Sequence, residues 1–269
     1  MLRIATCLEL PEPDADAAPL AAALERARIS FTLVAWDDPA ADWTAPHPTI
    51  IRSTWNYPLA VTSFLAWLER AQGPLHNPRE IIRGNVYKRY LLALAERGVP
   101  VVPTTIVEKN ATIALPTERV VIKPEVGAGS LHTRVFEAGD PAVHEHLALI
   151  EGAALVQPYI ASVDDYGERS IVLIDGELSH AIRKAPRFAG GSESVTGPFP
   201  IAPEEREVAL AAFAPYPDLL YGRCDLARDA NGRPMVMELE LIEPSLFFWK
   251  YPPAAERFVA GLQRRELHR

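Results

Sequence analysis

Three acidic residues in the last quarter of the chain have the spacing of a metal site. Asp225 lies in one apolar run, Glu238 and Glu240 lie in the next, and an Asn-Gly pair between the runs is a strong signal for a β-hairpin turn. Because side chains alternate between the two faces of a strand, Asp225 shares a face with Arg223, and Glu238 shares a face with Glu240. Facing carboxylates destabilise a sheet unless a cation joins them, and their hard oxygen atoms favour Mg²⁺ or Mn²⁺. The alternative is a solvated strand face paired with Lys and Arg.

A second pattern is typical of phosphate binding. An apolar run ends in Lys123, and the small residues Gly127, Gly129 and Ser130 follow closely. Small residues let backbone N–H groups approach a phosphate, and a lysine at the strand end adds a point charge. The spacing is neither that of a P-loop nor that of a Rossmann turn. A glycine-rich hairpin with an exposed lysine is the alternative interpretation.

A third pattern could hold a nucleoside. An apolar run continues through Gln157, Tyr159 and Ile160 to an acidic pair that ends with Asp165. Extended backbone can hydrogen-bond to a purine edge, and a carboxylate can accept a hydrogen bond from a ribose hydroxyl. An edge strand followed by a polar turn would have the same residues.

Two groups of basic and polar residues suit an anionic substrate. Arg183, Lys184 and Arg187 form a basic cluster beside a Gly-Gly pair, although an exposed hairpin tip would look the same. The other group is the segment 52–57, RSTWNY, in which Arg52 ends a short apolar run. At a strand end, Arg52 can hold a substrate carboxylate through two parallel hydrogen bonds, with Ser53, Asn56 and Tyr57 adding further contacts. The alternative is a surface arginine near the start of a helix.

The elements that must position these residues alternate between strand and helix early in the chain. The periodicity predicts strands at 2–8, 29–36 and 49–54, and helices at 19–28, 59–71 and 85–97. Further strands are predicted at 99–104, 119–124, 132–136, 154–160, 168–175, 177–185, 219–227 and 234–241, a polar loop at 189–198, and helices at 141–150, 203–214 and 253–268. This order predicts a mixed α/β and α+β fold. We expect an N-terminal α/β unit at 1–83, a helix with a small lid at 84–165, and an antiparallel α+β domain at 166–269.

The composition excludes several classes of protein. With 269 residues, 48% hydrophobic and 23% charged, the chain is neither disordered nor fibrous. A net charge of −8 disfavours binding to nucleic acid or to anionic membranes. No apolar run reaches the length of a transmembrane helix, and the first residues turn acidic before a signal peptide could form, so we expect a cytoplasmic protein. Cys7 and Cys224 lie in apolar runs, which favours buried thiols. Glu243, just before Pro244, is expected to cap the turn that follows it.

In their order along the chain, these patterns resemble the ATP-grasp superfamily over about residues 85–245. The resemblance implies an ATP-grasp fold whose N-terminal unit faces the substrate, with ATP and Mg²⁺ (or Mn²⁺) as cofactors. It assigns phosphate contacts to Lys88, Lys123, Gly127, Gly129 and Ser130, adenine contacts to Gln157, Tyr159 and Ile160, a ribose contact to Asp165, and Mg²⁺ ligation to Asp225, Glu238 and Glu240. The family usually has Asn where this chain has Glu240, and the extra negative charge leaves the number of bound ions open.

Within the superfamily, the chain is most similar to glutathione-synthetase-like ligases, and the segments RSTWNY, KRYLLAL, GVPVVPT and MELELIEPSLFF further resemble the O-ureido-serine cyclo-ligases of cycloserine biosynthesis. The resemblance implies that ATP activates the carboxylate of a small amino-acid-like substrate as an acyl phosphate, and that a nitrogen then displaces phosphate to form an amide or a ring. The expected catalytic side chains are Lys184 and Arg223, and the expected substrate contacts are Arg52, Ser53, Asn56, Tyr57 and Arg183. Related ligases are often dimers, so a homodimer is among the expectations. The alternatives are a kinase on the same ATP frame and a non-catalytic nucleotide-binding module.

Overall fold

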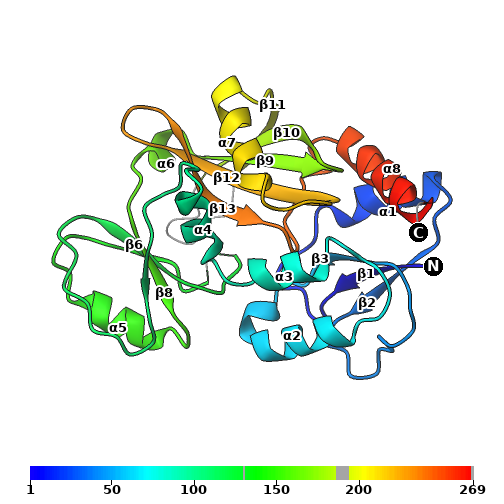
Figure 1. Cartoon of the computed structure of the whole chain (residues 1–269), viewed down its shortest axis with the longest axis horizontal. Helices are drawn as coiled ribbons and strands as arrows, with labels where there is room; N and C mark the ends of the chain where they lie inside the picture. Colours follow the sequence, from blue (N-terminus) through cyan, green and yellow to red (C-terminus); the bar gives the residue numbers. More distant parts are fainter. Residues whose placement is uncertain (130, 186–193, 268–269) are drawn as a thin grey trace.

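A computed structural model describes residues 1–129, 131–185 and 194–267, and it contains three β-sheets built from successive parts of the chain (Figure 1). The first sheet is parallel, with the strand order β2-β1-β3-β4. Its strands are β1 (Leu2–Thr6), β2 (Phe31–Ala35), β3 (Thr49–Ser53) and β4 (Leu75–His76), and the helical segments among and after them are α1 (Ala17–Arg26), η1 (Tyr57–Leu59), α2 (Val61–Arg70) and α3 (Arg79–Asn85).

Helix α2 shows how the sequence builds this unit. Its apolar residues Phe64, Trp67 and Leu68 are three and four positions apart, so they share one face, and all three are fully buried. The ring of Trp67 packs edge-on against Trp43 at 5.0 Å and obliquely against Trp36 at 6.1 Å. An aromatic core therefore holds the helix against the strands.

The largest sheet is antiparallel and has helices on both faces. Its order is β11-β10-β9-β12-β13. The strands are β9 (Glu168–Ile174), β10 (Glu177–Lys184), β11 (Val195–Phe199), β12 (Tyr221–Arg228) and β13 (Pro234–Glu240), and the covering helices are α4 (Tyr90–Glu96), α7 (Pro203–Phe213) and α8 (Pro253–Leu267). On β9, Ile171 and Leu173 pack towards α4 and α7, whereas Val172 and Ile174 pack towards α1 and α8.

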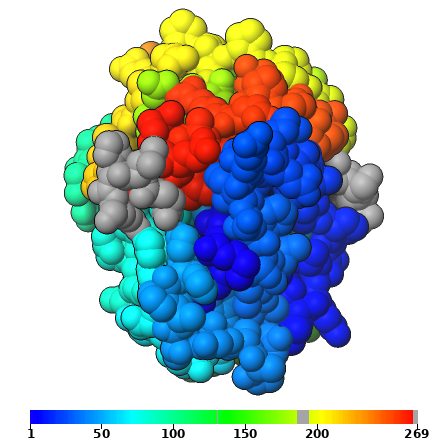
Figure 2. All heavy atoms as spheres, turned by 90° about the vertical axis from the view of Figure 1, so that its right-hand side faces the viewer, coloured from blue at the N-terminus to red at the C-terminus, as the bar shows by residue number. Residues whose placement is uncertain are grey.

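The ends of the chain meet on this sheet. Helix α8 contacts α1, and Figure 2 shows the red C-terminal helix against the blue N-terminal part of the chain. The N-terminal unit and the large sheet therefore share one continuous core. None of the helices within the described ranges is both long enough and apolar enough to cross a membrane.

The third sheet is small and lies at one end of the molecule (Figure 1). It is antiparallel, with the order β5-β8-β6-β7. Its elements are β5 (Thr105–Val107), β6 (Val120–Pro124), β7 (Arg134–Phe136), α5 (Ala142–Leu149), β8 (Ala154–Pro158) and the short α6 (Ser162–Asp165) that follows. Helix α5 covers it through Val143, which packs with Ile122 and Phe136 in a separate small core.

The structure corrects the prediction of one helix over 85–97. The chain forms α3 and α4 with a turn at 86–89 between them, and Lys88 lies in that turn. The interruption has a physical cause, because side chains on both sides of the turn bind the edge of β13. Asn85 donates to the Leu239 carbonyl and accepts from the Leu241 N–H, both at 2.8 Å, and the Tyr90 hydroxyl accepts from the Leu239 N–H at 3.2 Å.

Two further predictions were wrong in detail. The predicted strand at 99–104 forms only an isolated bridge between Val101 and Val236, because Pro100 and Pro103 have no N–H to donate to a ladder. The last part of the predicted polar loop at 189–198 is the strand β11, and residues 186–193 lie outside the described ranges. Cys7 and Cys224 are free and buried, as expected.

Candidate active site

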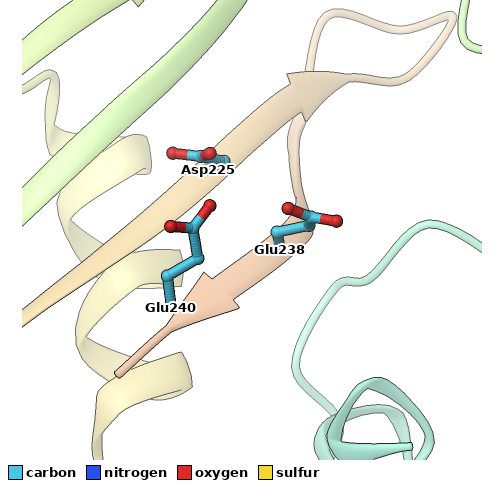
Figure 3. A group of neighbouring side chains, drawn as sticks. All are labelled: Asp225, Glu238 and Glu240. Atoms are coloured by element: carbon cyan, nitrogen blue, oxygen red, sulfur yellow. The ribbon is translucent and has the colours of Figure 1, made fainter. Parts of the chain in front are cut away.

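The three acids predicted as metal ligands converge on one face of the β12–β13 hairpin (Figure 3). Asp225 pairs with Glu238 in the register, and Glu240 pairs with Arg223. One oxygen atom from each carboxylate can be chosen so that all three lie within 4.8 Å of one another. The alternation of the strand residues therefore predicts the geometry, and the role of the three acids as metal ligands stays a prediction.

Asp225 lies between two cations. Its carboxylate accepts hydrogen bonds from Arg223 Nε at 2.9 Å and Nη2 at 3.0 Å, and from Lys184 Nζ at 2.7 Å. Arg223 also binds Glu240, and Lys184 lies 3.2 Å from Glu168. All the side chains in direct contact with Asp225 are at least nine-tenths buried, so these ion pairs are screened little by solvent.

Glu238 joins the two lysines that the resemblance assigns to ATP. Its Oε1 atom lies 3.2 Å from Lys88 Nζ and 3.0 Å from Lys123 Nζ. Lys88 also donates to the carbonyl of Gly127 at 2.9 Å, which ties it to the small-residue loop. Gly129 has a φ of 59°, in the left-handed region that favours glycine, and Ser130 lies outside the described residues. The structure thus brings the predicted phosphate lysines and the predicted metal ligands into one cluster.

Neighbouring cations lower the pKa of two of these three acids. Burial raises the pKa of each carboxyl, but at Asp225 the two cations outweigh burial and hold the pKa at about 2. The two lysines beside Glu238 likewise lower its pKa. The pKa of Glu240 is raised, because burial and the neighbouring acids outweigh its contact with Arg223.

The predicted nucleoside residues lie on and after β8. The pairing of β5 with β8 covers Ala154–Val156, so Gln157 is the first residue beyond it. The Gln157 side chain donates to Thr104 at 2.9 Å. Tyr159 stacks against the Arg119 guanidinium at 3.8 Å and donates its hydroxyl hydrogen to Asp164, and Ile160 follows it at the start of the loop to α6. These contacts hold the segment in place and leave its predicted role untested.

A small cavity of about 100 Å³ joins the end of α6 to the basic strand. Its lining includes Asp165, Arg183 and Lys184. Arg183 points to the other face of β10 from Lys184 and lies 5.9 Å from the ring of Phe199. Arg187, the third member of the predicted basic cluster, lies outside the described residues.

The predicted substrate residues of the N-terminal unit divide into two pairs. Ser53 bonds to the hydroxyl of Thr6, and Asn56 bonds to Trp36 and Asp37, so both side chains are engaged within their own unit. Arg52 instead reaches the segment after β13, where it binds the Pro244 carbonyl. Tyr57 is buried against Phe64, and its pKa is raised first by burial and next by Glu243.

Arg52 is a buried residue, with only 2% of its side chain exposed, so the alternative of a surface arginine is wrong. Its Nη2 atom donates to the carbonyl of Pro244 at 2.9 Å and lies 3.5 Å from the carboxylate of Asp16. Its other guanidinium nitrogens have no hydrogen-bond partner within the described part of the chain. The guanidinium lies 5.5 Å from the ring of Tyr221.

Glu243 was expected to cap a turn, and the structure gives that role to Asp16. The Asp16 carboxylate accepts from the N–H groups of Leu246, Phe247 and Phe248 at 2.6–3.0 Å. The Glu243 carboxyl is 8% exposed, and burial raises its pKa to about 8, with a further contribution from Glu240. Nothing in the sequence around Glu243 distinguished this burial from that of any acid three residues after Glu240, so it was not predicted.

Comparison with known proteins gives consistent matches. The family model described as "D-cycloserine synthetase DcsG, N-terminal domain" matches residues 2–77. The "Cycloserine biosynthesis protein DcsG" of Streptomyces lavendulae is 34% identical over 281 residues, which cover 94% of each protein.

Solved structures extend the match to the whole fold. The crystal structure of D-cycloserine synthetase DcsG superposes with a TM-score of 0.90 at 31% identity, over 98% of this chain and 99% of that one. D-alanine–D-alanine ligase from Bacillus anthracis, complexed with ATP, gives a TM-score of 0.69 at 14% identity, over 100% and 99% of the two chains, and so shares the fold alone. The mixed α/β and α+β architecture expected from the sequence, with its ATP-grasp fold, is thereby confirmed.

Proposed function

Since the chain belongs to the family of the cycloserine biosynthesis protein DcsG and is an ATP-grasp ligase, we propose that it activates the carboxylate of a small amino acid as an acyl phosphate and closes a ring. The relative is a biosynthetic protein for cycloserine, and the solved neighbour is named as its synthetase. The substrate class that this supports is an O-ureido-serine. The nitrogen nucleophile then belongs to the same molecule as the carboxylate.

The observation that carries the proposal is the convergence of three carboxylates and an arginine on β12 and β13 with three lysines from other elements, Lys88, Lys123 and Lys184. The donors fit Mg²⁺ or Mn²⁺, because all three are oxygen ligands and at least Asp225 and Glu238 have pKa values lowered by neighbouring cations. When bound there, the ion would neutralise charge on the phosphates of ATP. The expected ligands are Asp225, Glu238 and Glu240.

The residues around the acids form two groups, one proposed to bind the nucleotide and the other proposed to bind the acyl group of the substrate. At the nucleotide end, Lys88 and Lys123 exchange Glu238 for phosphate oxygens, and the backbone at Gly127 and Gly129 closes over them. The segment after β8 is proposed to hold the adenine through Gln157, Tyr159 and Ile160 and the ribose through Asp165. These contacts orient the γ-phosphorus.

At the acyl end, Arg223 and Lys184 are the cations available to the substrate. A substrate carboxylate oxygen attacks the γ-phosphorus, the bond to the β-phosphate oxygen breaks, and ADP leaves. Arg223 and Lys184 stabilise the anionic oxygens of the acyl phosphate. A nitrogen of the substrate then attacks the acyl carbon, loses a proton, and displaces phosphate as the C–N bond forms. Arg52, Tyr57 and Arg183 remain proposed substrate contacts.

Phosphate release by the wild-type protein tests the function. We expect release from Mg-ATP with O-ureido-serine, and a cyclic product by mass spectrometry. A stable phosphorylated product would instead identify a kinase, and binding of ATP without turnover of any carboxylate would identify a nucleotide-binding module. The proposal also includes a cytoplasmic location, where ATP is available, a homodimer, and no nucleic-acid or membrane partner.

A further inference from the structure

One carboxyl near the metal cluster, that of Glu243, has no ion-pair partner among the described residues. No other described side chain donates to its oxygens, its own backbone N–H is the donor it has, and the residue is more than nine-tenths buried. It is also separate from the metal cluster, whose members are Asp225, Glu238 and Glu240. Arg223 donates to the carbonyl of Ser245, two residues after Glu243, at 3.2 Å, so the backbone that carries Glu243 lies against the acyl end of the proposed site.

The backbone around Glu243 is held residue by residue. The Trp55 indole donates to the Glu243 carbonyl at 3.2 Å, Arg52 to the Pro244 carbonyl at 2.9 Å, and Arg223 to the Ser245 carbonyl at 3.2 Å. Asp16 binds the next three N–H groups. Residues 243–248, here called the anchored segment, are therefore fixed from both the N-terminal unit and the large sheet.

An anchored, buried carboxyl without a cation is suited to a positively charged ligand. Burying an ionised carboxylate without a cation costs free energy, which a bound cation offsets. Because the backbone is already ordered, binding does not carry the entropy cost of ordering it. The pKa of about 8 is consistent with this absence of a cation. Tyr57, whose pKa is raised by burial and next by Glu243, is held by its ring packing on Phe64 at 4.7 Å.

We propose that Glu243 is a substrate-binding residue whose carboxylate binds the α-ammonium group of the amino-acid substrate. This inference rests on the proposed function, since it takes the acceptor to be an amino acid. The substrate's carboxylate then faces Arg223 and Lys184, while the ammonium group, two bonds away, faces Glu243. A carboxylic acid without the amino group would leave Glu243 buried without a cation, so Glu243 selects amino acids over simple acids.

Binding measurements test this without requiring turnover. Calorimetry in Mg²⁺ and a non-hydrolysable ATP analogue would compare O-ureido-serine with its analogue that carries hydrogen in place of the α-amino group. We expect the wild type to prefer the amino acid by about tenfold to a hundredfold. Glu243→Gln, which keeps the size and removes the charge, should lose most of this preference, and Glu243→Asp should retain part of it.

The controls separate a lost contact from a lost fold. Glu207→Gln, on an exposed position of α7, should behave as the wild type. The affinity of Glu243→Gln for the ATP analogue and for the desamino acid should stay within about twofold of the wild type. Equal preference in the wild type and Glu243→Gln, or no binding of the amino acid to the wild type, would overturn the inference. Phosphate release, measured in parallel, tests the proposed function separately. The preference for the amino acid is a binding measurement, so it can be found or not found whether or not the protein turns the substrate over.

Discussion

Asp225 on the β12–β13 face and Glu243 in the anchored segment are both more than nine-tenths buried, but their pKa values are shifted in opposite directions. Asp225 is 2% exposed with a pKa held at about 2, whereas Glu243 is 8% exposed with a pKa raised to about 8. The difference lies in cations at bonding distance, which Asp225 has and which Glu243 lacks among the residues that the structure describes. Burial alone therefore does not set the charge of an acid here. In the proposed function, the acids of the paired region bind a metal ion while their lysines bind phosphate, and the unpaired Glu243 binds the cation of the substrate.

The largest effect should follow from removing the charge of Asp225. Asp225→Asn deletes an oxygen anion from the predicted metal site and from between Arg223 and Lys184, so turnover should fall on the order of 10³-fold. The fold should survive, because Arg223 keeps Glu240 and Lys184 keeps Glu168. Phosphate release at saturating Mg²⁺ and a thermal melt measure the two effects. Turnover near the wild-type value would remove the metal assignment of Asp225.

Glu238→Gln sharpens the comparison, because two opposite effects are expected. The apparent affinity for Mg²⁺ should fall by about 10–100-fold, since one ligand is lost. ADP without metal should bind about two- to tenfold more tightly, because Lys88 and Lys123 no longer pair with a carboxylate. Calorimetry with ADP in the presence of a chelator measures the second effect. Weaker binding of metal-free ADP would show that the Glu238 pairs do not compete with phosphate.

Arg52→Lys tests the anchoring of the unpaired region. Lysine keeps the charge but loses the planar guanidinium, which donates to the Pro244 carbonyl and lies beside Asp16. The free energy of unfolding should therefore fall by about 1–3 kcal/mol. Amino-acid affinity should fall about tenfold with ATP affinity unchanged. Urea unfolding and calorimetry measure these changes.

The matched control is Arg26→Lys, at an exposed arginine whose ion pair with Glu256 is also exposed. It should change the free energy of unfolding by under about 0.5 kcal/mol. Unchanged kinetics and stability in Arg52→Lys would contradict both roles.

The smallest effect concerns pH. Between about 4.5, the ordinary pKa of a glutamate, and about 8, the folded protein keeps the Glu243 proton that the unfolded chain releases. The folded state binds more protons, so this group makes stability fall as pH rises through that interval. Glu243→Gln removes this pH-dependent loss of stability. Without metal or nucleotide, the Tm of the variant minus the Tm of the wild type should therefore be larger at pH 8.5 than at pH 5, by about 2 °C or more. A pH-independent difference in Tm would show that Glu243 has an ordinary pKa.

Local patterns predicted the paired region well. The two-residue period of the strands and the Asn-Gly turn lie within 20 residues of one another, and they place Asp225, Glu238 and Glu240 on one face without any knowledge of the fold. The strand-end pattern before the small-residue loop predicted Lys123, and the resemblance to ATP-grasp ligases added Lys88; the structure brings both lysines to Glu238.

Distant contacts explain what the sequence could not show. The break between α3 and α4 depends on Asn85, whose partner Leu239 is 154 positions away. Arg52 and Pro244 are 192 positions apart, and Asp16 and Phe248 are 232 apart. Neither burial nor the partners of such residues leave a periodic signal in the chain, so the unpaired state of Glu243 became visible only in three dimensions.

The anchored segment limits where this enzyme can be recombined with its relatives. A chimera joined between the N-terminal unit and the rest of the chain would take Asp16, Arg52 and Trp55 from one parent and residues 243–248 from the other. Each of these bonds crosses from one part to the other, so an exchange of the first 80 residues alone would separate these side chains from the backbone groups to which they bind. Transplanting substrate preference between such enzymes therefore requires two segments to be exchanged together, although they lie at opposite ends of the gene.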